Sequence, residues 1–211
     1  MTGHRANRTD DRGLALVELA LVLPLLALLV FGIFEFGFLW GDVNSVDRAS
    51  QNAARTGSSL GDQRFADYEA LRAVESTLAG LDGATPLRVI TYLSTDVDGA
   101  VPQACLDVTA VGTSAKGVSG LCNVYSPQQI ADDNPGNFGS STPALTDCLS
   151  SAWDSAWCPT GRSRSLNDPD YLGVFVEAEY EGRTSIIPAS ITVEQRAVYQ
   201  IEPCKAGETT C

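Results

Sequence analysis

The stretch Gly13-Leu14-Ala15-Leu16-Val17-Glu18-Leu19 opens the long apolar run that decides the architecture of this chain. Residues 14–40 carry only two charges, Glu18 and Glu35. A helix of this length rises about 40 Å, which is enough to span a bilayer with some tilt. A cleavable secretory signal has a shorter apolar core followed by a small-x-small site, and residues 36–41 offer no such site. The run therefore predicts a transmembrane helix over residues 14–40.

The flanks of this run predict its orientation. Residues 1–13 contain Arg5, Arg8 and Arg12, and basic residues beside a membrane helix tend to stay in the cytoplasm. We therefore expect a cytoplasmic leader over residues 1–13 and an extracytoplasmic portion over residues 41–211. This outer portion has 11 Lys/Arg against 22 Asp/Glu, which argues against nucleic acid as a partner because phosphate binding needs a basic surface.

Glu18 and Pro24 are the two unusual residues of the predicted membrane helix. A carboxylate costs roughly 2.5–3.5 kcal/mol at the centre of a membrane helix and less near an interface, so Glu18 calls for a function. The plain alternative is a side chain that reaches the interface or is protonated in lipid. Pro24 lacks an N–H and predicts a kinked or loosened helix, although membrane helices also tolerate proline without a special role.

Residues 16–26, 31–37 and 52–57 resemble the TadE-like family, the minor pseudopilins of tight-adherence (Flp, type IVb) pilus systems. The resemblance implies that a prepilin peptidase cuts between Gly13 and Leu14, so that Glu18 becomes the fifth residue of the mature chain. Leu19 departs from the family, which more often has an aromatic residue there. The resemblance also implies these partners: the major pilin and other pseudopilins, the prepilin peptidase, the inner-membrane pilus assembly platform and the lipid bilayer.

The resemblance gives Glu18 a specific role in assembly. Cleavage would leave a free amine on Leu14, and Glu18 of one subunit could neutralise that amine of its neighbour. Breaking one side of a buried ion pair costs about 3–5 kcal/mol, so such a pair would set the register between packed helices.

All six cysteines follow the apolar run, which predicts disulfides in an oxidising compartment. They are Cys105, Cys122, Cys148, Cys158, Cys204 and Cys211. The sequence has no C-x-x-C pair and its only histidine is His4, so we expect no metal site and no cofactor. Sequence cannot choose among the possible pairings. Pairing of sequence neighbours would join Cys105 to Cys122, Cys148 to Cys158 and Cys204 to Cys211.

The exported portion changes from helical to strand periodicity along its length. Apolar residues at spacings of three and four predict an amphipathic helical segment over residues 41–83, with a break or bend at residues 57–61. A β-rich domain follows over residues 84–211. The expected strands are residues 87–93, 105–111, 171–182 and 190–201.

Residues 112–170 are rich in Gly, Ser, Pro, Asp and Asn and predict a long loop held by disulfides, with Trp153 and Trp157 packing locally. The sequence thus predicts an α+β, pilin-like fold. Its long N-terminal helix continues from the membrane and packs on a small antiparallel sheet of about four strands.

Catalysis has little support in the sequence. Without a histidine outside the leader, the usual Ser-His and Cys-His nucleophile pairs are unavailable. Glu177, Glu179 and Glu181 share one face of a predicted strand, and a solvated edge explains them better than acid–base chemistry. The acidic stretches 96–99 and 132–134 lack the ligand spacing of an EF-hand loop.

Two classes of function remain open. As a minor pseudopilin, the protein would be a substrate and a building block, not an enzyme, used in assembly, priming or capping of a Flp pilus. The alternative is an uncleaved single-pass membrane protein whose disulfide-stapled outer domain binds a ligand. Retention of residues 1–13 in the mature protein would favour the alternative. A secreted hydrolase, a third class, would instead predict release of the outer portion.

Overall fold

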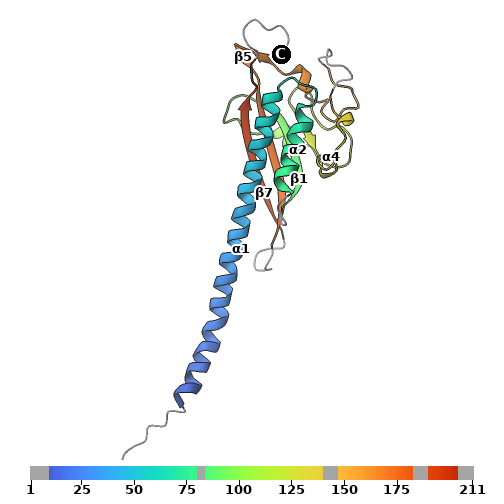
Figure 1. The fold of residues 1–211 in the computed structure, drawn as a ribbon. Helices are drawn as coiled ribbons and strands as arrows, with labels where there is room; N and C mark the ends of the chain where they lie inside the picture. The colour runs from blue at the N-terminus through green and yellow to red at the C-terminus, as the bar shows by residue number, and fades with distance from the viewer. Residues whose placement is uncertain (1–9, 80–83, 140–146, 183–189, 204–211) are drawn as a thin grey trace, which may run out of the picture.

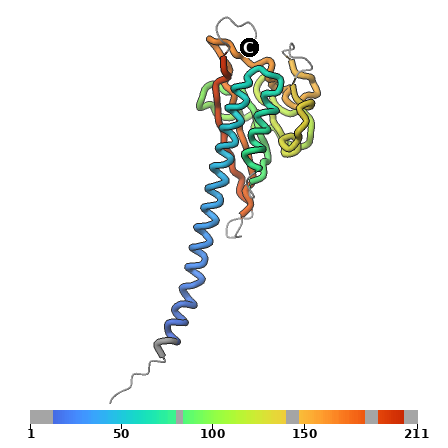
Figure 2. The backbone as a smooth tube through the Cα atoms, viewed as in Figure 1, coloured from blue at the N-terminus to red at the C-terminus, as the bar shows by residue number. Residues whose placement is uncertain are grey.

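The computed structural model describes residues 10–79, 84–139, 147–182 and 190–203. Helix α1 (Asp10–Leu60) runs without interruption over 51 residues, about 77 Å at 1.5 Å per residue. Figures 1 and 2 show its first half projecting as a stalk and its second half lying on the folded domain.

Helix α2 (Ala66–Leu78) turns back along the upper half of α1. The turn begins at Gly61, whose φ of 58° lies in the left-handed region, and its N–H donates to the carbonyl of Gly57 at 2.9 Å. The break predicted at residues 57–61 is therefore a helix end. Helix α2 buries Ala70, Leu71 and Val74 at spacings that form one helix face.

A five-stranded antiparallel sheet forms the other layer, in the order β2-β3-β1-β6-β7. Its strands are β1 (Ala84–Ser94), β2 (Gly117–Val118), β3 (Cys122–Tyr125), β6 (Tyr171–Glu181) and β7 (Ser190–Gln200). In the central register, Val89 of β1 pairs with Val176 of β6, which pairs with Gln195 of β7. The fold is α+β and pilin-like, a long N-terminal apolar helix packed on an antiparallel sheet.

The predicted strand at residues 105–111 is wrong. Helix α3 (Gln103–Leu106) follows Pro102, and the chain after it is irregular. Cys105 is buried and joined to Cys122, so a covalent link and burial fix this segment in place of strand pairing.

The predicted loop 112–170 contains several short elements. Strands β2 and β3 belong to the main sheet, while β4 (Arg164–Ser165) and β5 (Asp168–Pro169) form a separate pair. The helical turns are α4 (Pro127–Ile130), η1 (Pro135–Asn137) and η2 (Pro159–Gly161).

The two faces of the sheet carry two cores. Alternate residues of β6, among them Val174, Val176 and Tyr180, face the helices, as the alternation of the sequence predicts. Phe175 faces the opposite side and packs with apolar residues from the segment 101–121. Trp153 joins the helix-facing core, with its ring 5.3 Å from that of Phe138, so the tryptophans do not form a separate local cluster.

Candidate functional site

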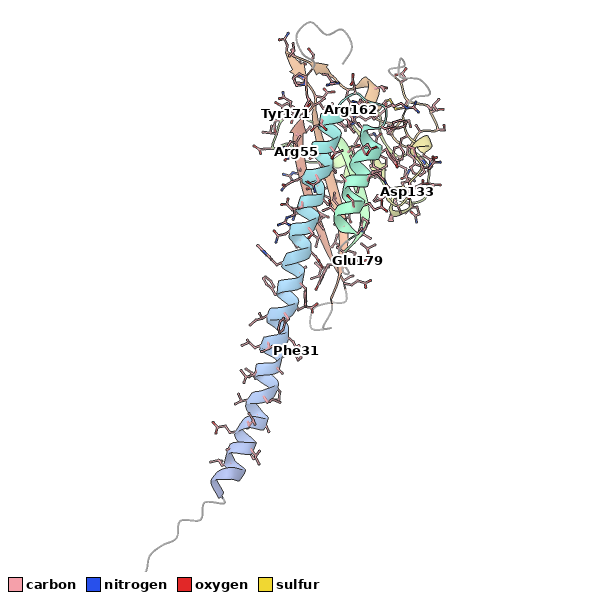
Figure 3. The ribbon with its side chains drawn as sticks, viewed as in Figure 1. Phe31, Arg55, Asp133, Arg162, Tyr171 and Glu179 are labelled. Carbon is pink, nitrogen blue, oxygen red and sulfur yellow. A yellow bond between two sulfur atoms is a disulfide. The ribbon has the colours of Figure 1, made fainter. Side chains whose placement is uncertain are left out.

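The stalk of α1, residues 13–34, presents apolar side chains on every side. Leu14, Leu21 and Phe31 are 70, 75 and 53 % exposed. Figure 3 shows side chains around Phe31 projecting into open space below the domain. The core helix of a soluble protein buries such residues in protein, so this surface requires another apolar environment. The stalk is about 33 Å long, which matches the hydrocarbon thickness of a bilayer, and α1 is long and apolar enough to cross a membrane.

Gly13, Leu14 and Glu18 lie in the first turns of α1. A Cβ added at Gly13 would meet no described atom within 4 Å, and Gly13 and Leu14 are both exposed. Leu14 and Glu18 are four residues apart and therefore lie one turn apart on the same face of the helix. Glu18 is exposed, which leaves its carboxylate accessible to a group outside the chain.

Helix α1 continues through Pro24. The missing N–H removes one hydrogen bond, to the carbonyl of Ala20 one turn earlier. The proline therefore loosens the middle of the stalk at one bond without ending the helix.

The stalk ends where Glu35 meets the sheet. Glu35 is fully buried, and its Oε1 accepts a hydrogen bond from the phenol of Tyr180 on β6 at 3.2 Å. A buried carboxylate is costly without such polar contacts. Phe36 and Trp40 remain exposed beyond this point, whereas Val46 enters the core. The face of α1 that carries Glu35 and Val46 is therefore already buried against the domain, whereas Phe36 and Trp40 on another face are still exposed.

Small residues allow the upper half of α1 to pack closely against β6. Ala49 and Ala53 are fully buried. A Cβ added at Gly57 would stand 2.5 Å from Cδ2 of Leu172, which is closer than real Cβ contacts come. The absence of a side chain at Gly57 therefore permits the approach of helix and strand.

A buried ionic cluster, which the sequence did not reveal, holds α2 to the sheet. The Oδ2 atom of Asp67 accepts hydrogen bonds from Thr91 at 2.8 Å, Asn123 at 2.9 Å and Tyr125 at 2.6 Å. Its Oδ1 atom accepts from Nη2 of Arg162 at 2.7 Å, and both side chains of this ion pair are fully buried. The signal in the sequence was a carboxylate on the apolar face of a predicted helix.

Asp154 adds a second buried carboxyl group to this cluster. It accepts hydrogen bonds from the backbone N–H of Gly139 at 2.8 and 3.0 Å. Burial, and secondly the negative charge of Asp67, raise the pKa of Asp154 to about 7. The Arg162 guanidinium lies 4.0 Å from the centre of the Trp157 ring. Its positive charge pairs with Asp67 and partly offsets the rise in the pKa of Asp154. These contacts tie Gly139 and the segment from Asp154 to Arg162 to the core.

Two disulfides brace the outer parts of the domain. Cys105 of α3 is joined to Cys122 of β3, and Cys148 is joined to Cys158. Both pairs agree with the pairing of sequence neighbours. The third expected pair, Cys204 with Cys211, lies outside the described residues, as does His4.

Three of the other carboxylates considered in the sequence, Glu177, Asp96 and Asp132, have structural partners. Oε2 of Glu177 accepts a hydrogen bond from Nε of Arg88 at 2.8 Å, so Glu177 forms an ion pair and is not part of a solvated edge. In the two acidic stretches, Oδ1 of Asp96 and Oδ1 of Asp132 accept from backbone N–H groups two residues later, at 2.9 and 2.7 Å. Such bonds are typical of turns.

Comparison with known proteins identifies one part of the chain. Residues 13–55 match the family described as TadE-like protein. The matched region covers the stalk and the first turns of α1 that enter the core. No curated protein and no solved structure matches the chain.

Proposed function

From the TadE-like domain at residues 13–55, we propose that this protein is a minor pseudopilin, cut between Gly13 and Leu14 by a prepilin peptidase. It then takes part in assembling, priming or capping a Flp-type (type IVb, tight adherence) pilus. The observation that carries the proposal is the exposed apolar stalk with one carboxylate, Glu18, near its N-terminal end.

Membrane anchoring follows from the surface of the stalk. Apart from Glu18, the exposed residues of the stalk are apolar around the whole circumference of the helix, so lipid can solvate every side of it. Beyond the stalk, α1 enters the protein core at Glu35 and Val46. A cut by signal peptidase near the end of the apolar run would separate the stalk from the part of the same helix that packs in the domain. The domain after residue 40 is proposed to lie outside the cytoplasm, because the basic residues precede the stalk.

Cleavage after Gly13 requires the chain to open locally. Gly13 lies in the first turn of α1, where backbone N–H groups have no helical partner. Unwinding this end therefore costs little, and among the described residues no side chain lies within 4 Å of a Cβ placed at Gly13. The proposed peptidase thus meets an exposed bond at the fraying end of a helix.

The cut would place a new positive charge on the face that carries Glu18. The amine of Leu14 would stand one turn from its own Glu18, and the same two groups would be available to a neighbouring subunit. In the low dielectric of packed helices this charge pair is strong and specific. The partners proposed for the stalk are therefore the helices of the major pilin and other pseudopilins, together with the inner-membrane assembly platform.

The test is the N-terminal sequence and intact mass of the protein extracted from its native membrane. We expect the wild-type chain to start at Leu14. Gly13→Leu should keep residues 1–13, because a large side chain then blocks the scissile bond. Gly32→Leu is the matched control, since both glycines lie in open space on the same helix. Glu18→Ala should impair pilus assembly while the protein stays in the membrane.

A wild-type chain that retains residues 1–13 would refute the processing step. It would leave an uncleaved membrane-anchored binding protein as the better account. Normal processing together with normal piliation of Glu18→Ala would remove the proposed role of this carboxylate.

A further inference from the structure

We propose that the free edge of β7 binds an extended segment of a different protein, which adds to the sheet as a further strand and carries a basic and an acidic side chain two residues apart. Strand β7 is eleven residues long and is the last strand of its sheet. Within the described residues it pairs with β6 alone, so its other edge presents backbone donors and acceptors to a partner.

A groove beside this edge can receive side chains of the added strand. It has a volume of about 500 Å³ and lies on the sheet face opposite α1. Phe175 and Val198 form apolar parts of its lining, while Asp98, Glu194 and Arg196 supply charges. Main-chain bonds along β7 would give affinity, and the groove would select side chains.

The charges on β7 specify the pattern of the partner. Glu194 and Arg196 are both exposed and lie on the same face of the strand. Among the ion pairs between described residues, neither one takes part. Glu194 even stands opposite Glu177, whose own partner is Arg88. A strand added at the free edge can therefore satisfy both charges, with a basic side chain opposite Glu194 and an acidic one opposite Arg196.

A second copy of this chain fits the edge poorly. Parallel pairing of the same free edge of two β7 strands would turn one sheet over, so Glu194 and Arg196 of the two copies would lie on opposite faces and neither charge would meet a partner. Antiparallel pairing about Gln195 would match the charges but would point the two stalks in opposite directions. Two subunits anchored in one membrane cannot adopt that arrangement, so this step rests on the proposed membrane function. The occupant is therefore a strand of another protein.

The test measures binding of dye-labelled nine-residue peptides to the full-length protein in lipid nanodiscs by fluorescence anisotropy. The peptides alternate Thr and Val around a central Lys-x-Glu, Lys-x-Lys or Glu-x-Glu, and a fourth version of the Lys-x-Glu peptide has two central prolines. We expect the wild type to bind Lys-x-Glu about fivefold more tightly than either like-charged peptide. The proline peptide should not bind, because its two central residues have no N–H to donate to the edge of β7.

The variant Glu194→Arg should reverse the preference and select the Glu-x-Glu peptide. Glu69→Arg, an exposed charge reversal on α2, should behave as wild type. Absence of binding, binding that ignores the charges, or binding of the proline peptide would each overturn the proposal. Binding that appears only after deletion of residues 204–211 would assign the edge to the chain's own tail. A dimer in nanodiscs that Glu194→Arg abolishes would assign it to a second copy. The binding experiment and the N-terminal sequencing that tests processing are separate measurements, so either proposal can fail while the other holds.

Discussion

At the scale of single residues, Asp154 is a buried carboxyl group whose pKa is raised far above its value in water. Two buried carboxyl groups, Asp67 and Asp154, share one buried cation, Arg162. The ion pair of Asp67 is direct, whereas Asp154 is held by the backbone N–H of Gly139. Ionisation of Asp154 therefore adds a buried negative charge that Arg162 and the N–H of Gly139 compensate only in part.

Replacing this group should change how the stability of the domain depends on pH. The folded state raises the pKa of Asp154 from 3.8 to about 7, so the folded protein binds more protons than the unfolded chain between these values. Its contribution is most favourable below pH 4 and is lost as the pH rises to about 7. Asp154→Asn cannot ionise, so the variant does not lose this stability, which is on the order of 4 kcal/mol. The free energy of unfolding of the variant should therefore exceed that of wild type by an amount that grows from pH 4 to pH 7.

The measurement is denaturant unfolding of both proteins in detergent, followed by tryptophan fluorescence at several pH values. Asp168→Asn is the control, because this aspartate is exposed at the start of β5. A difference between Asp154→Asn and wild type that does not vary with pH would contradict the assignment.

At the scale of elements, the glycines of α1 divide into two kinds. Gly41 lies in open space, whereas Gly57 faces Leu172 of β6 at a distance that excludes a Cβ. Gly41→Ala should therefore stabilise the protein by about 0.5–1 kcal/mol, because alanine favours the helix. Gly57→Ala should destabilise it by about 1–3 kcal/mol, since Leu172 or the helix must move.

Thermal unfolding in detergent, followed by circular dichroism, compares the two variants. The midpoint should rise for Gly41→Ala and fall for Gly57→Ala. Equal shifts in the same direction would show that helix propensity alone decides the outcome and that the contact with β6 is unimportant.

Elements with a strong period were predictable from sequence, and elements fixed by distant contacts were not. The alternation of β6 is clear because Val174 and Val176 face one core and Phe175 the other. Strand β3 was missed because it has only four residues and its Asn123 breaks the apolar pattern. That side chain is buried only because Asp67 and the carbonyl of Trp157 accept its N–H groups.

The candidate site divides in the same way. Gly13, Leu14 and Glu18 were named from the resemblance of a short local stretch to the TadE-like family, and their role in processing stays a prediction. The pair of Asp67 and Arg162 joins residues 95 positions apart, and no local pattern indicates such a contact. The predicted strand at residues 105–111 failed for a related reason, because a disulfide to β3 holds that segment.

At the scale of the whole molecule, the stalk should place Trp40 near the outer boundary of the membrane. The chain has three tryptophans, and Trp40 is 63 % exposed while Trp153 and Trp157 are 6 % exposed. Aromatic side chains such as Trp favour the headgroup region. In vesicles whose lipids carry bromine close to the headgroup, wild-type fluorescence should be partly quenched. Trp40→Phe should be insensitive, and equal quenching of both proteins would refute this depth.

The unbroken course of α1 has a mechanical consequence. Its last turn reaches the far end of the domain, where the carbonyl of Ser58 accepts a hydrogen bond from the N–H of Glu202 at 3.1 Å. Tension applied at that end is carried down one rod whose hydrogen bonds run parallel to its axis. Because α1 is continuous, tension on the folded part is transmitted along the helix to the stalk, and Pro24, where one backbone hydrogen bond is missing, is the point at which the helix yields most easily.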